Sequence, residues 1–402
     1  MRALKALVPA GSGDLPAAFF GLWWGVLVNR LASFAVAFLG PYLVQARGLA
    51  VAPAGRVVAL FGLGVALAGP LGGALADRLG RRATMAGGLT AGALSVGGLA
   101  LAHGPLLLAG LSFLSGAASE LYRPALNAAV ADLVPPAHRV RAYGLLYWAT
   151  NLGTAVGLLL AGMVAGKSLP ALLLADAATS LAGAAIVLLR VPETKPAALP
   201  LPSASGGLRR ALSDGPFVAF LGLHFAALLV FGQWQLALPV DLAARGHGPG
   251  TFARLMALNC AGVVLLQPVL GPGLDRRDRS LLLAAMALLF GTGYGLYALG
   301  GGLAPYLFGT LLWTVGEVLG FPAASALVAD LAPEATRGRY QGAFTMVVGL
   351  ALALAPLLGG EIYGTFGATA LWLSALGLAG LSAGGHLLAR GPRRCRAGRG
   401  AL

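Results

Sequence analysis

Twelve apolar stretches follow one another along the chain, and they constrain its fold more than any other feature of the sequence. Each is close to the length of about 20 residues that a helix needs to cross the hydrocarbon core of a bilayer. They cover residues 17–43, 55–76, 84–103, 105–130, 142–166, 170–190, 217–242, 251–273, 280–300, 304–329, 340–363 and 367–389. Only 10% of the residues are charged, whereas a soluble domain has about 25%. The sequence therefore predicts an all-α membrane protein with twelve transmembrane helices.

The basic residues are distributed unevenly across the predicted membrane. If the N-terminus is cytoplasmic, 21 of the 28 Lys and Arg residues lie in cytoplasmic segments, five lie outside, and Arg30 and Arg123 lie within spans. Such an excess on one side is the positive-inside pattern of membrane proteins. We therefore expect both termini in the cytoplasm. The net charge of +14 is then a topology signal, and we expect no nucleic-acid partner.

The two halves of the chain repeat each other at an offset of 198 residues. Val130-Ala-Asp-Leu133 returns as Val328-Ala-Asp-Leu331, and Asp77 returns as Asp275. Parallel six-helix repeats are typical of secondary transporters. A segment rich in Pro, Ser and Gly separates the halves and is predicted to be a linker. We predict an N-terminal six-helix bundle over 1–190, a cytoplasmic linker over 191–216, a C-terminal six-helix bundle over 217–390 and a basic cytoplasmic tail over 391–402 that contacts membrane lipid.

A distinctive motif follows the second span. It reads Gly73-Ala-Leu-Ala-Asp77-Arg78-Leu-Gly80-Arg81-Arg82. This motif resembles the signature loop of the major facilitator superfamily, and with the twelve spans and the repeat the resemblance covers the whole chain. We expect the Asp77 carboxylate to gain from the dipole at the start of the third span. The motif then forms a cytoplasmic conformational latch made of Gly73, Asp77, Arg78, Gly80, Arg81 and Arg82.

Within this superfamily the chain is similar to bacterial twelve-helix drug:proton antiporters. Leu121-Tyr-Arg-Pro-Ala125 and the pair Arg139 and Arg141 carry that similarity. Two positions depart from the pattern: Ser112 stands where many members have an Arg, and Leu158 where the antiporter signature has a Pro. The resemblance implies a proton-coupled multidrug exporter of the cell inner membrane. The departures leave open a proton-coupled uptake symporter of a small metabolite, and a lipid translocase is a further alternative.

Charged residues inside the spans are the first candidates for a functional site. Arg30, Glu120, Arg123 and Glu317 lie in spans one, four and ten, which the resemblance assigns to the lining of a central cavity. A charge at mid-bilayer costs about 2.5–3.5 kcal/mol in insertion assays, so each needs a partner or a function. Glu317 has no basic residue three or four positions away. We therefore predict Glu317, and after it Glu120, as the proton-coupling residues.

Helical spacing adds polar and aromatic residues to the same cavity. Aromatic surfaces beside a few polar groups suit amphiphilic small molecules. The predicted substrate cavity comprises Asn29, Arg30, Arg123, Asn127, Tyr147, Asn151, His224, Phe231, Gln235 and Trp313. Structural alternatives remain open: Glu120 and Arg123 can neutralise each other, Arg30 can be a fixed partner of Glu120, and His224 can be a packing residue.

No pattern in the sequence indicates enzyme chemistry. The chain has no Gly-x-x-x-x-Gly-Lys loop for ATP, no nucleophile–base spacing and no cluster of metal ligands. Its two cysteines, Cys260 and Cys395, are far apart. We therefore expect no catalytic residue, no metal and no cofactor. The expected partners are a small amphiphilic substrate, protons and membrane lipid, and the expected state is a monomer.

The topology can be tested at Ser205, in the middle of the predicted linker. In Ser205→Cys, a membrane-impermeant maleimide should label the thiol only after the cells are opened, because the linker is expected to be cytoplasmic. Labelling of intact cells at the rate seen for an extracellular control cysteine would contradict this topology.

Overall fold

The computed structural model describes residues 15–32, 39, 42–49, 51–165, 168–195, 207–247 and 249–391, and within these ranges the chain is almost entirely helical. The middle of the predicted linker, residues 196–206, and the tail from residue 392 lie outside the described residues. The first half contains α2 (Ala17–Arg30), the π-helical turn η2 (Tyr42–Ala46), α4 (Val51–Leu79), α5 (Arg81–Leu101), α6 (Pro105–Leu133), the 3-10 turn η3 (Pro136–His138), α7 (Arg139–Ala165) and α8 (Leu169–Arg190). The second half contains α9 (Gly207–Leu212), α10 (Gly215–Phe231), η4 (Gly232–Gln235), α11 (Ala237–Ala244), α12 (Pro249–Leu274), α13 (Arg279–Gly295), η5 (Leu296–Leu299), α14 (Ala304–Leu331), η6 (Glu334–Thr336) and α15 (Arg337–Leu388).

A described helix falls within each predicted span, so the twelve-helix prediction is confirmed. Span seven is divided into α10, the 3-10 turn η4 and α11. Spans eleven and twelve run together as α15, which bends at Gly367 (φ 83°, ψ 173°). A positive φ is a conformation that glycine adopts at little cost, so this residue can join the two spans. Within the described ranges, eight helical segments are long and apolar enough to cross a membrane by length and composition alone.

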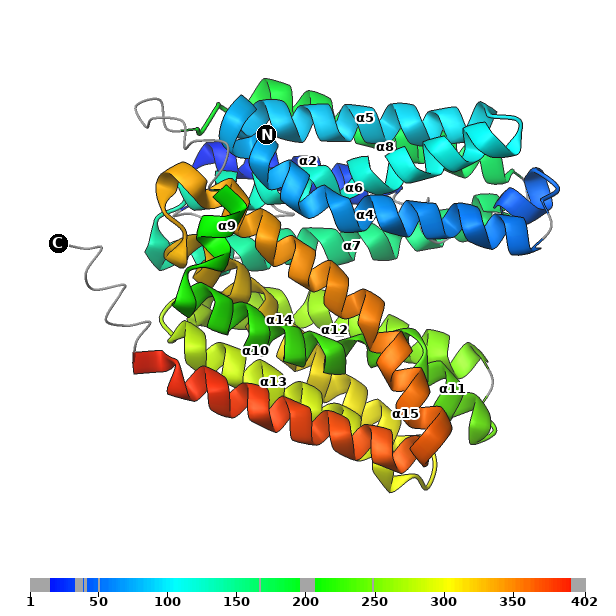
Figure 1. The fold of residues 1–402 in the computed structure, drawn as a ribbon, viewed down its shortest axis with the longest axis vertical. Coiled ribbons are helices and arrows are strands. Elements are labelled where there is room, and N and C mark those ends of the chain that lie inside the picture. Colours follow the sequence, from blue (N-terminus) through cyan, green and yellow to red (C-terminus); the bar gives the residue numbers. More distant parts are fainter. Residues whose placement is uncertain are drawn as a thin grey trace.

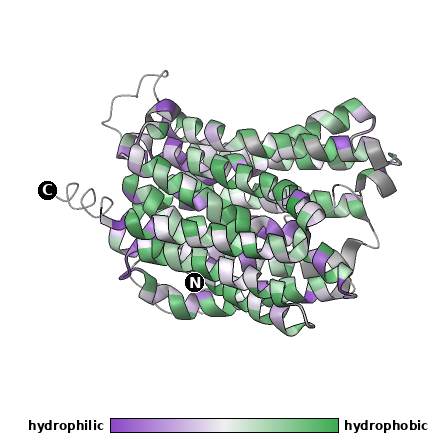
Figure 2. Cartoon of the chain, turned by 60° about the horizontal axis from the view of Figure 1, so that its bottom comes forward, coloured by the Kyte–Doolittle hydropathy of each residue, from purple (hydrophilic) through white to green (hydrophobic). Residues whose placement is uncertain are grey.

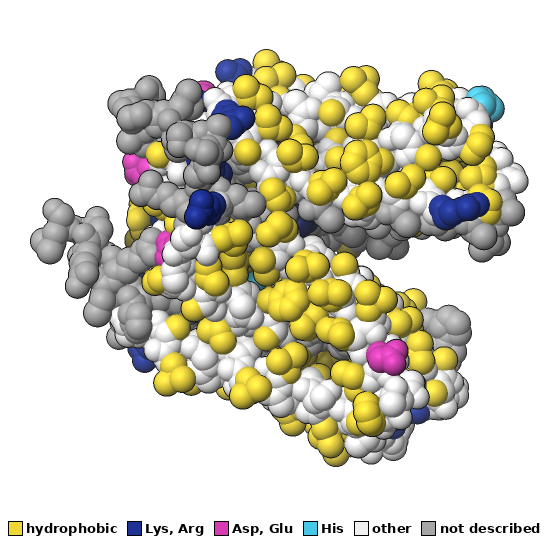
Figure 3. Space-filling model, in the orientation of Figure 1, with side chains coloured by type: hydrophobic (Ala, Val, Ile, Leu, Met, Phe, Trp, Pro, Cys, Tyr) yellow, Lys and Arg dark blue, Asp and Glu magenta, His cyan; other side chains and the backbone are white. Residues whose placement is uncertain are grey.

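The helices form two bundles that meet at one end (Figure 1). In the first bundle α6 packs against α4 and α5, and α8 packs against α2 and α5. In the second, α13 packs against α14 and α15, and α12 packs against α14. Between the bundles, α4 contacts α15, and α7 contacts α12 and α14. We call the end where these contacts and the α4–α5 turn lie the closed end, and the opposite end, where Figure 3 shows a hollow between the bundles, the open end.

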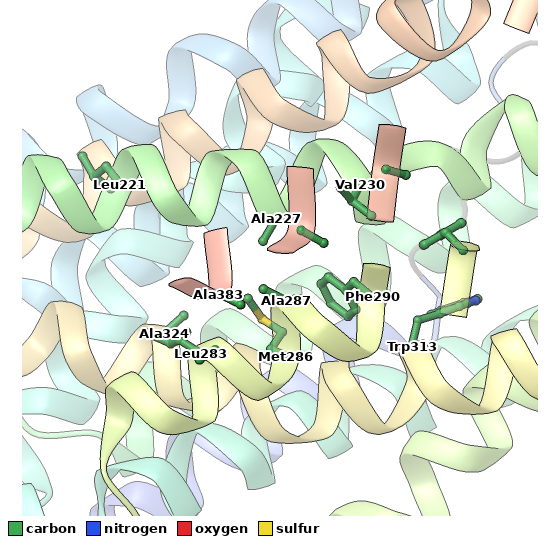
Figure 4. Packing of buried hydrophobic residues seen from close by; sticks show 14 of the residues in the cluster. Leu221, Ala227, Val230, Leu283, Met286, Ala287, Phe290, Trp313, Ala324 and Ala383 are labelled. Atoms are coloured by element: carbon green, nitrogen blue, oxygen red, sulfur yellow. The ribbon is translucent and has the colours of Figure 1, made fainter. Parts of the chain in front are cut away.

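Apolar side chains cover the outside of the bundles as well as their cores. Leu94, Leu265 and Leu381 are among many large hydrophobic residues that are more than half exposed, and Figure 2 shows hydrophobic residues along most of the helix length. Such a surface is suited to lipid, where every backbone group must be satisfied within the protein. Inside the second bundle, side chains of α10, α13, α14 and α15 meet in one cluster that includes Met286 and Phe290 (Figure 4).

Glycines allow the close packing of α4 on α6. A Cβ atom on Gly116 would overlap the carbonyl oxygen of Phe61, and one on Gly64 would overlap that of Phe113. Small residues at helix contacts are common in membrane proteins because they let backbones approach.

This packing predicts that Gly116→Ala destabilises the first bundle by about 1–3 kcal/mol, the usual effect of overpacking a tight contact. Gly110→Ala is the matched control, because it lies on the same helix and a Cβ there meets nothing within 4 Å. Thermal unfolding in detergent should show a lower transition temperature for Gly116→Ala and no decrease for the control. Equal transition temperatures for the two variants would contradict the packing argument.

Candidate functional site

Asp77, near the end of α4, crosses from the first bundle to the second at the closed end. Its carboxylate accepts hydrogen bonds from the backbone N–H groups of Gly338 (2.9 Å) and Arg339 (3.0 Å) at the start of α15. The Arg81 guanidinium lies 3.2 Å away, and Asp77 is 3% exposed. The first N–H groups of a helix lack partners within the helix and carry partial positive charge. The buried carboxylate therefore binds the two bundles together.

The expectation that the Asp77 carboxylate gains from the helix dipole at the start of span three is wrong. The first N–H groups of α5, those of Arg81 and Arg82, are bound instead by the Glu193 carboxylate at 2.8 and 3.2 Å. Glu193 follows α8, and next to it Lys195 donates to the Arg78 carbonyl oxygen (2.7 Å). Because Glu193 satisfies α5, Asp77 is available to bind α15. The sequence did carry a signal for Glu193, an acidic residue three positions after the end of the sixth span.

The other latch residues have different surroundings. A Cβ atom on Gly73 would overlap the Gly338 carbonyl oxygen, so this glycine allows α4 to approach α15. Gly80 has a φ of 104°, which favours glycine in the tight α4–α5 turn. The Arg78 side chain is exposed, and Arg82 donates to the Leu188 carbonyl within the first bundle. The structure therefore brings Gly73, Asp77 and Arg81 to the bundle interface, but not the side chains of Arg78 and Arg82.

The second half repeats the contact of Asp77. Asp275, its counterpart, accepts a hydrogen bond from the Arg141 backbone N–H (2.9 Å) near the start of α7. Burial raises the pKa of the Asp275 carboxyl, although the hydrogen bond from Arg141 opposes this effect. Among the described contacts, Asp275 has one backbone donor from the other bundle and Asp77 has two, so we expect the second contact to hold the closed end less strongly.

Two further carboxylates complete the closed end. Asp132 lies 3.1 Å from Arg81 in its own bundle and 2.6 Å from Arg337 in the other. Its counterpart Asp330 lies 3.6 Å from Arg279 and, across the interface, 2.6 Å from Arg139. Each carboxylate thus links one arginine of its own bundle to one of the other. Separating such a pair of charges is strongly destabilising when the charges are buried.

Glu317 lies in the middle of α14 and is 2% exposed. Its carboxylate accepts hydrogen bonds from the Tyr147 hydroxyl of α7 (2.5 Å) and from the Asn259 amide of α12 (3.2 Å). Asn259 also donates to Thr314 (3.0 Å). Among the residues that the structure describes, Glu317 forms no ion pair. The carboxylate is therefore held by neutral groups, one of them from the other bundle.

Glu120 is paired within its own helix. Arg123 lies 3.0 Å from it, and the two side chains are 18% and 39% exposed. Arg30 donates instead to the Tyr122 hydroxyl (3.1 Å). The sequence left open whether Glu120 pairs with Arg123 or with Arg30. The geometry supports the pair with Arg123, and Arg30 lies further from Glu120.

Two predicted cavity residues, Asn29 and His224, pack inside their own bundles. Asn29 donates to Ser180 of α8 (3.0 Å). His224 lies between the rings of Phe220 and Phe344, each with its centroid 5.4 Å away. The placement of Asn29 and His224 in a cavity is therefore wrong, because helical spacing does not distinguish a face toward a neighbouring helix from a face toward the other bundle.

Trp313 is also wrongly placed in the cavity. Its indole N–H donates to Tyr297 (3.0 Å) and the side chain is 1% exposed in the core of the second bundle. Nearer the interface, Phe231 packs edge-on against Phe321, which packs edge-on against Tyr147. Tyr147 donates to Glu317, and Phe321 lies one turn further along the same helix as Glu317.

The remaining predicted cavity residues are half-buried or exposed. Asn151 donates to the Tyr147 carbonyl (2.9 Å), one turn back on α7. The Asn127 carbonyl accepts from Tyr143 (2.7 Å). Gln235 is exposed and donates to the Leu352 carbonyl (2.9 Å). These groups are accessible, but no described contact joins them to Glu317.

Asp241 on α11 is a buried carboxylate that the sequence analysis missed. It is 1% exposed and accepts hydrogen bonds from Tyr306 (2.6 Å), Trp372 (3.0 Å) and Arg245 (3.0 Å). These donors come from α14, α15 and the residue that follows α11, so Asp241 fixes the second part of span seven to the rest of its bundle. Its position in an apolar segment was the only signal that the sequence offered. Among the described residues, no group of three His, Cys, Asp or Glu could hold a metal.

Comparisons with known proteins agree with this architecture. A family model described as Major Facilitator Superfamily matches residues 22–240 and again 223–394. The multidrug resistance protein MdtH of Salmonella arizonae is 26% identical over 296 residues, which are 73% of this chain and 73% of that protein. The human organic anion transporter MFSD10 aligns with a TM-score of 0.78 and 20% identity, over 92% of this chain and 99% of its own. The E. coli fucose:proton symporter FucP aligns with a TM-score of 0.76 and 17% identity, over 93% and 98%. At these identities the two structures establish the fold alone.

The closed end predicts that Asp77→Asn shifts the protein toward a state in which this end is open. The substitution removes a charge that two backbone donors and Arg81 stabilise, a loss of about 1.5–3 kcal/mol. Spin labels at Ala137 and Ala335, one in each bundle, report the separation by double electron–electron resonance. Asp275→Asn should have a smaller effect, and identical distance distributions in Asp77→Asn and the parent would rule out the latch.

Proposed function

The chain belongs to the major facilitator superfamily of membrane transporters, and from this premise we propose that it is a proton-coupled exporter of amphiphilic small molecules in a bacterial cytoplasmic membrane. Support for the export of drugs comes from the similarity to the multidrug resistance protein MdtH. The fold supports alternating access, in which one bundle rocks against the other around a site between them. We propose that the moving units are residues 1–190 and 217–390, joined by the linker 191–216, in a protein that acts as a monomer.

We propose that the closed end faces the cytoplasm. The turns and helix ends there carry many of the basic residues, an arrangement that the positive-inside rule favours on the cytoplasmic side. The structure then corresponds to an outward-open state, held by Asp77, Asp132, Asp275 and Asp330. We propose further that both termini are cytoplasmic and that the basic tail contacts anionic lipid.

Glu317 is the proposed proton carrier, and one observation carries this assignment. Its carboxylate is 2% exposed, and its described partners are the neutral side chains of Tyr147 and Asn259. An ionised carboxylate in an apolar interior is costly unless a cation accompanies it. A proton can therefore occupy Glu317 in one state of the transport cycle and leave it in the other, when the groups around the carboxylate change. Glu120 is the second candidate, since Arg123 already neutralises it.

The proposed substrate cavity lies between the bundles beside Glu317. Tyr147 and Phe231 supply aromatic surface through their contacts with Phe321. The half-buried Asn127 and Asn151 and the partly exposed Arg123 supply polar groups. Aromatic rings with a few polar groups accommodate amphiphilic molecules of varied shape, which is consistent with multidrug export.

Uptake by proton symport is the second candidate, because one observation favours it. Ser112 occupies the place where many related exporters have an Arg, and its hydroxyl is fully buried and donates to the Val57 carbonyl (2.9 Å). That position thus offers no charge for exchange. Substrate accumulation in liposomes under a pH gradient of each sign separates symport from antiport. Substrate accumulates on the acidic side in antiport and on the alkaline side in symport.

The function predicts that Glu317→Gln loses proton coupling and retains substrate binding. The probe is the amphiphilic dye that stabilises the purified protein most in a thermal-shift screen. Dye binding should release protons from the parent in weakly buffered detergent solution, and Glu317→Gln should release at most about a tenth as many, since glutamine cannot carry the proton. Glu361→Gln is the matched control, because Glu361 is an exposed carboxylate on α15, and it should behave like the parent. If Glu317→Gln still drives uphill transport from a pH gradient, Glu317 is not the carrier.

A further inference from the structure

The hydrogen bond between Tyr147 and Glu317 crosses from one bundle to the other. Tyr147 belongs to α7 of the first bundle, and its hydroxyl lies 2.5 Å from the Glu317 carboxylate on α14 of the second. The other described partner of this carboxylate, Asn259, lies on α12 in the same bundle as Glu317. Among the described contacts of Glu317, Tyr147 is therefore the one that relative motion of the bundles must break or form.

Tyr147 lies on the part of α7 that closes the structure. The helix begins at Arg139, whose guanidinium binds Asp330 across the interface (2.6 Å). Tyr147 is eight residues later, about 12 Å along the helix at 1.5 Å per residue. The next residue, Trp148, donates its indole N–H to the Val264 carbonyl of α12 (2.8 Å). The same face of the second bundle thus holds α7 from its start to Tyr147, so opening the closed end draws Tyr147 away from Glu317.

The strength of this bond depends on the charge of Glu317. A hydrogen bond to an ionised carboxylate is about twice as strong as one between neutral groups. The titratable side chains that face Glu317 are Tyr147 from α7, Cys260 from α12 and Tyr294 from α13. No basic side chain of the described residues faces it. A change in the protonation of Glu317 therefore changes the strength of its bond to Tyr147 directly, because no neighbouring cation of the described residues compensates the change in charge.

We propose that Tyr147 is a positioning residue that transmits the charge of Glu317 to the closed end. This inference rests on the proposed role of Glu317 as proton carrier. Ionised Glu317 holds α7 against α14 through the Tyr147 hydroxyl and keeps the closed end shut. Protonation weakens the bond and allows the closed end to open. The proton thus changes the equilibrium between the two transporter states at a single contact between the bundles.

The test measures how the closed end responds to pH in Tyr147→Phe. The spin labels are placed at Ala137 and Ala335 after both native cysteines are replaced, and double electron–electron resonance gives the ratio of open to closed populations. In the parent this ratio should rise as the pH falls. In Tyr147→Phe the closed end should be more open at high pH than in the parent. The change of the open-to-closed ratio with pH should also be about five-fold smaller, because a hydrogen bond to a charged group and one to a neutral group differ in free energy by an amount that corresponds to about that factor in the ratio. Adding Glu317→Gln to this variant should produce little further change, because the two residues act through one bond.

Tyr143→Phe is the matched control. Tyr143 lies one turn earlier on α7, but its hydroxyl donates to the Asn127 carbonyl within the first bundle (2.7 Å). This variant should keep the pH response of the parent. Phenylalanine at 147 retains the ring that packs on Phe321. If Tyr147→Phe nevertheless fails to fold, Glu317→Asp provides the second variant, since it keeps the charge but shortens the side chain and withdraws it from Tyr147.

The outcomes separate this inference from the proposed function. A pH response that survives in Glu317→Gln overturns the assignment of Glu317 as carrier, and the inference with it. A response that is lost in Glu317→Gln but intact in Tyr147→Phe and Glu317→Asp overturns the inference alone. An equal loss in Tyr143→Phe and Tyr147→Phe also overturns it, because the effect would then come from hydroxyl removal on α7 rather than from the contact between the bundles.

Discussion

A charge in an apolar medium must be paired or neutralised, and this constraint explains where the buried carboxylates of the closed end and of the second bundle lie. At the closed end the requirement is met across the bundle interface. Asp77 is satisfied by the first backbone N–H groups of α15, and Asp132 is shared between Arg81 and Arg337. Each bundle supplies charges that the other completes. The closed end is therefore held by contacts between the bundles. Asp77 and Asp132 also have a partner, Arg81, within their own bundle, so the contacts between the bundles can be broken without leaving these charges unpaired.

The same constraint is met in two different ways deeper in the molecule. Asp241 has the Arg245 cation and the hydroxyl and indole donors of Tyr306 and Trp372, so it is a fixed anchor for α11. Glu317 has only neutral partners among the described residues. Of these two carboxylates on the second bundle, the one without a cation is suited to exchange a proton, and it is also the one with a partner on the opposite bundle. Proton exchange and bundle motion can thus meet at one side chain.

The repeat at an offset of 198 residues makes the closed end nearly symmetric. Asp77 binds the start of α15 and Asp275 binds the start of α7. The symmetry is imperfect where function is proposed. Tyr147 and Glu317 correspond by the offset to Thr345 and Ser119, which cannot form the same bond. The Tyr147–Glu317 bond has no counterpart in the repeat, so it can favour one of the two transporter states. The contacts of Asp77 and Asp275, in contrast, are repeated and close the same end together.

The sequence by itself determined the fold class, the helices and the family, because a bilayer requires apolar stretches of fixed length and because the signature motif and the repeat are visible in one dimension. It also identified Glu317 as a buried carboxylate without a basic neighbour on its helix. It could not determine which helix face turns toward which neighbour. Asn29, His224 and Trp313 share the polar and aromatic character of cavity residues, yet they pack inside their own bundles. The partners that Asp77 and Glu317 have in the opposite bundle, more than 100 residues away in the chain, were decided only by the tertiary structure. Contacts between bundles depend on how whole helices pack and leave no local pattern.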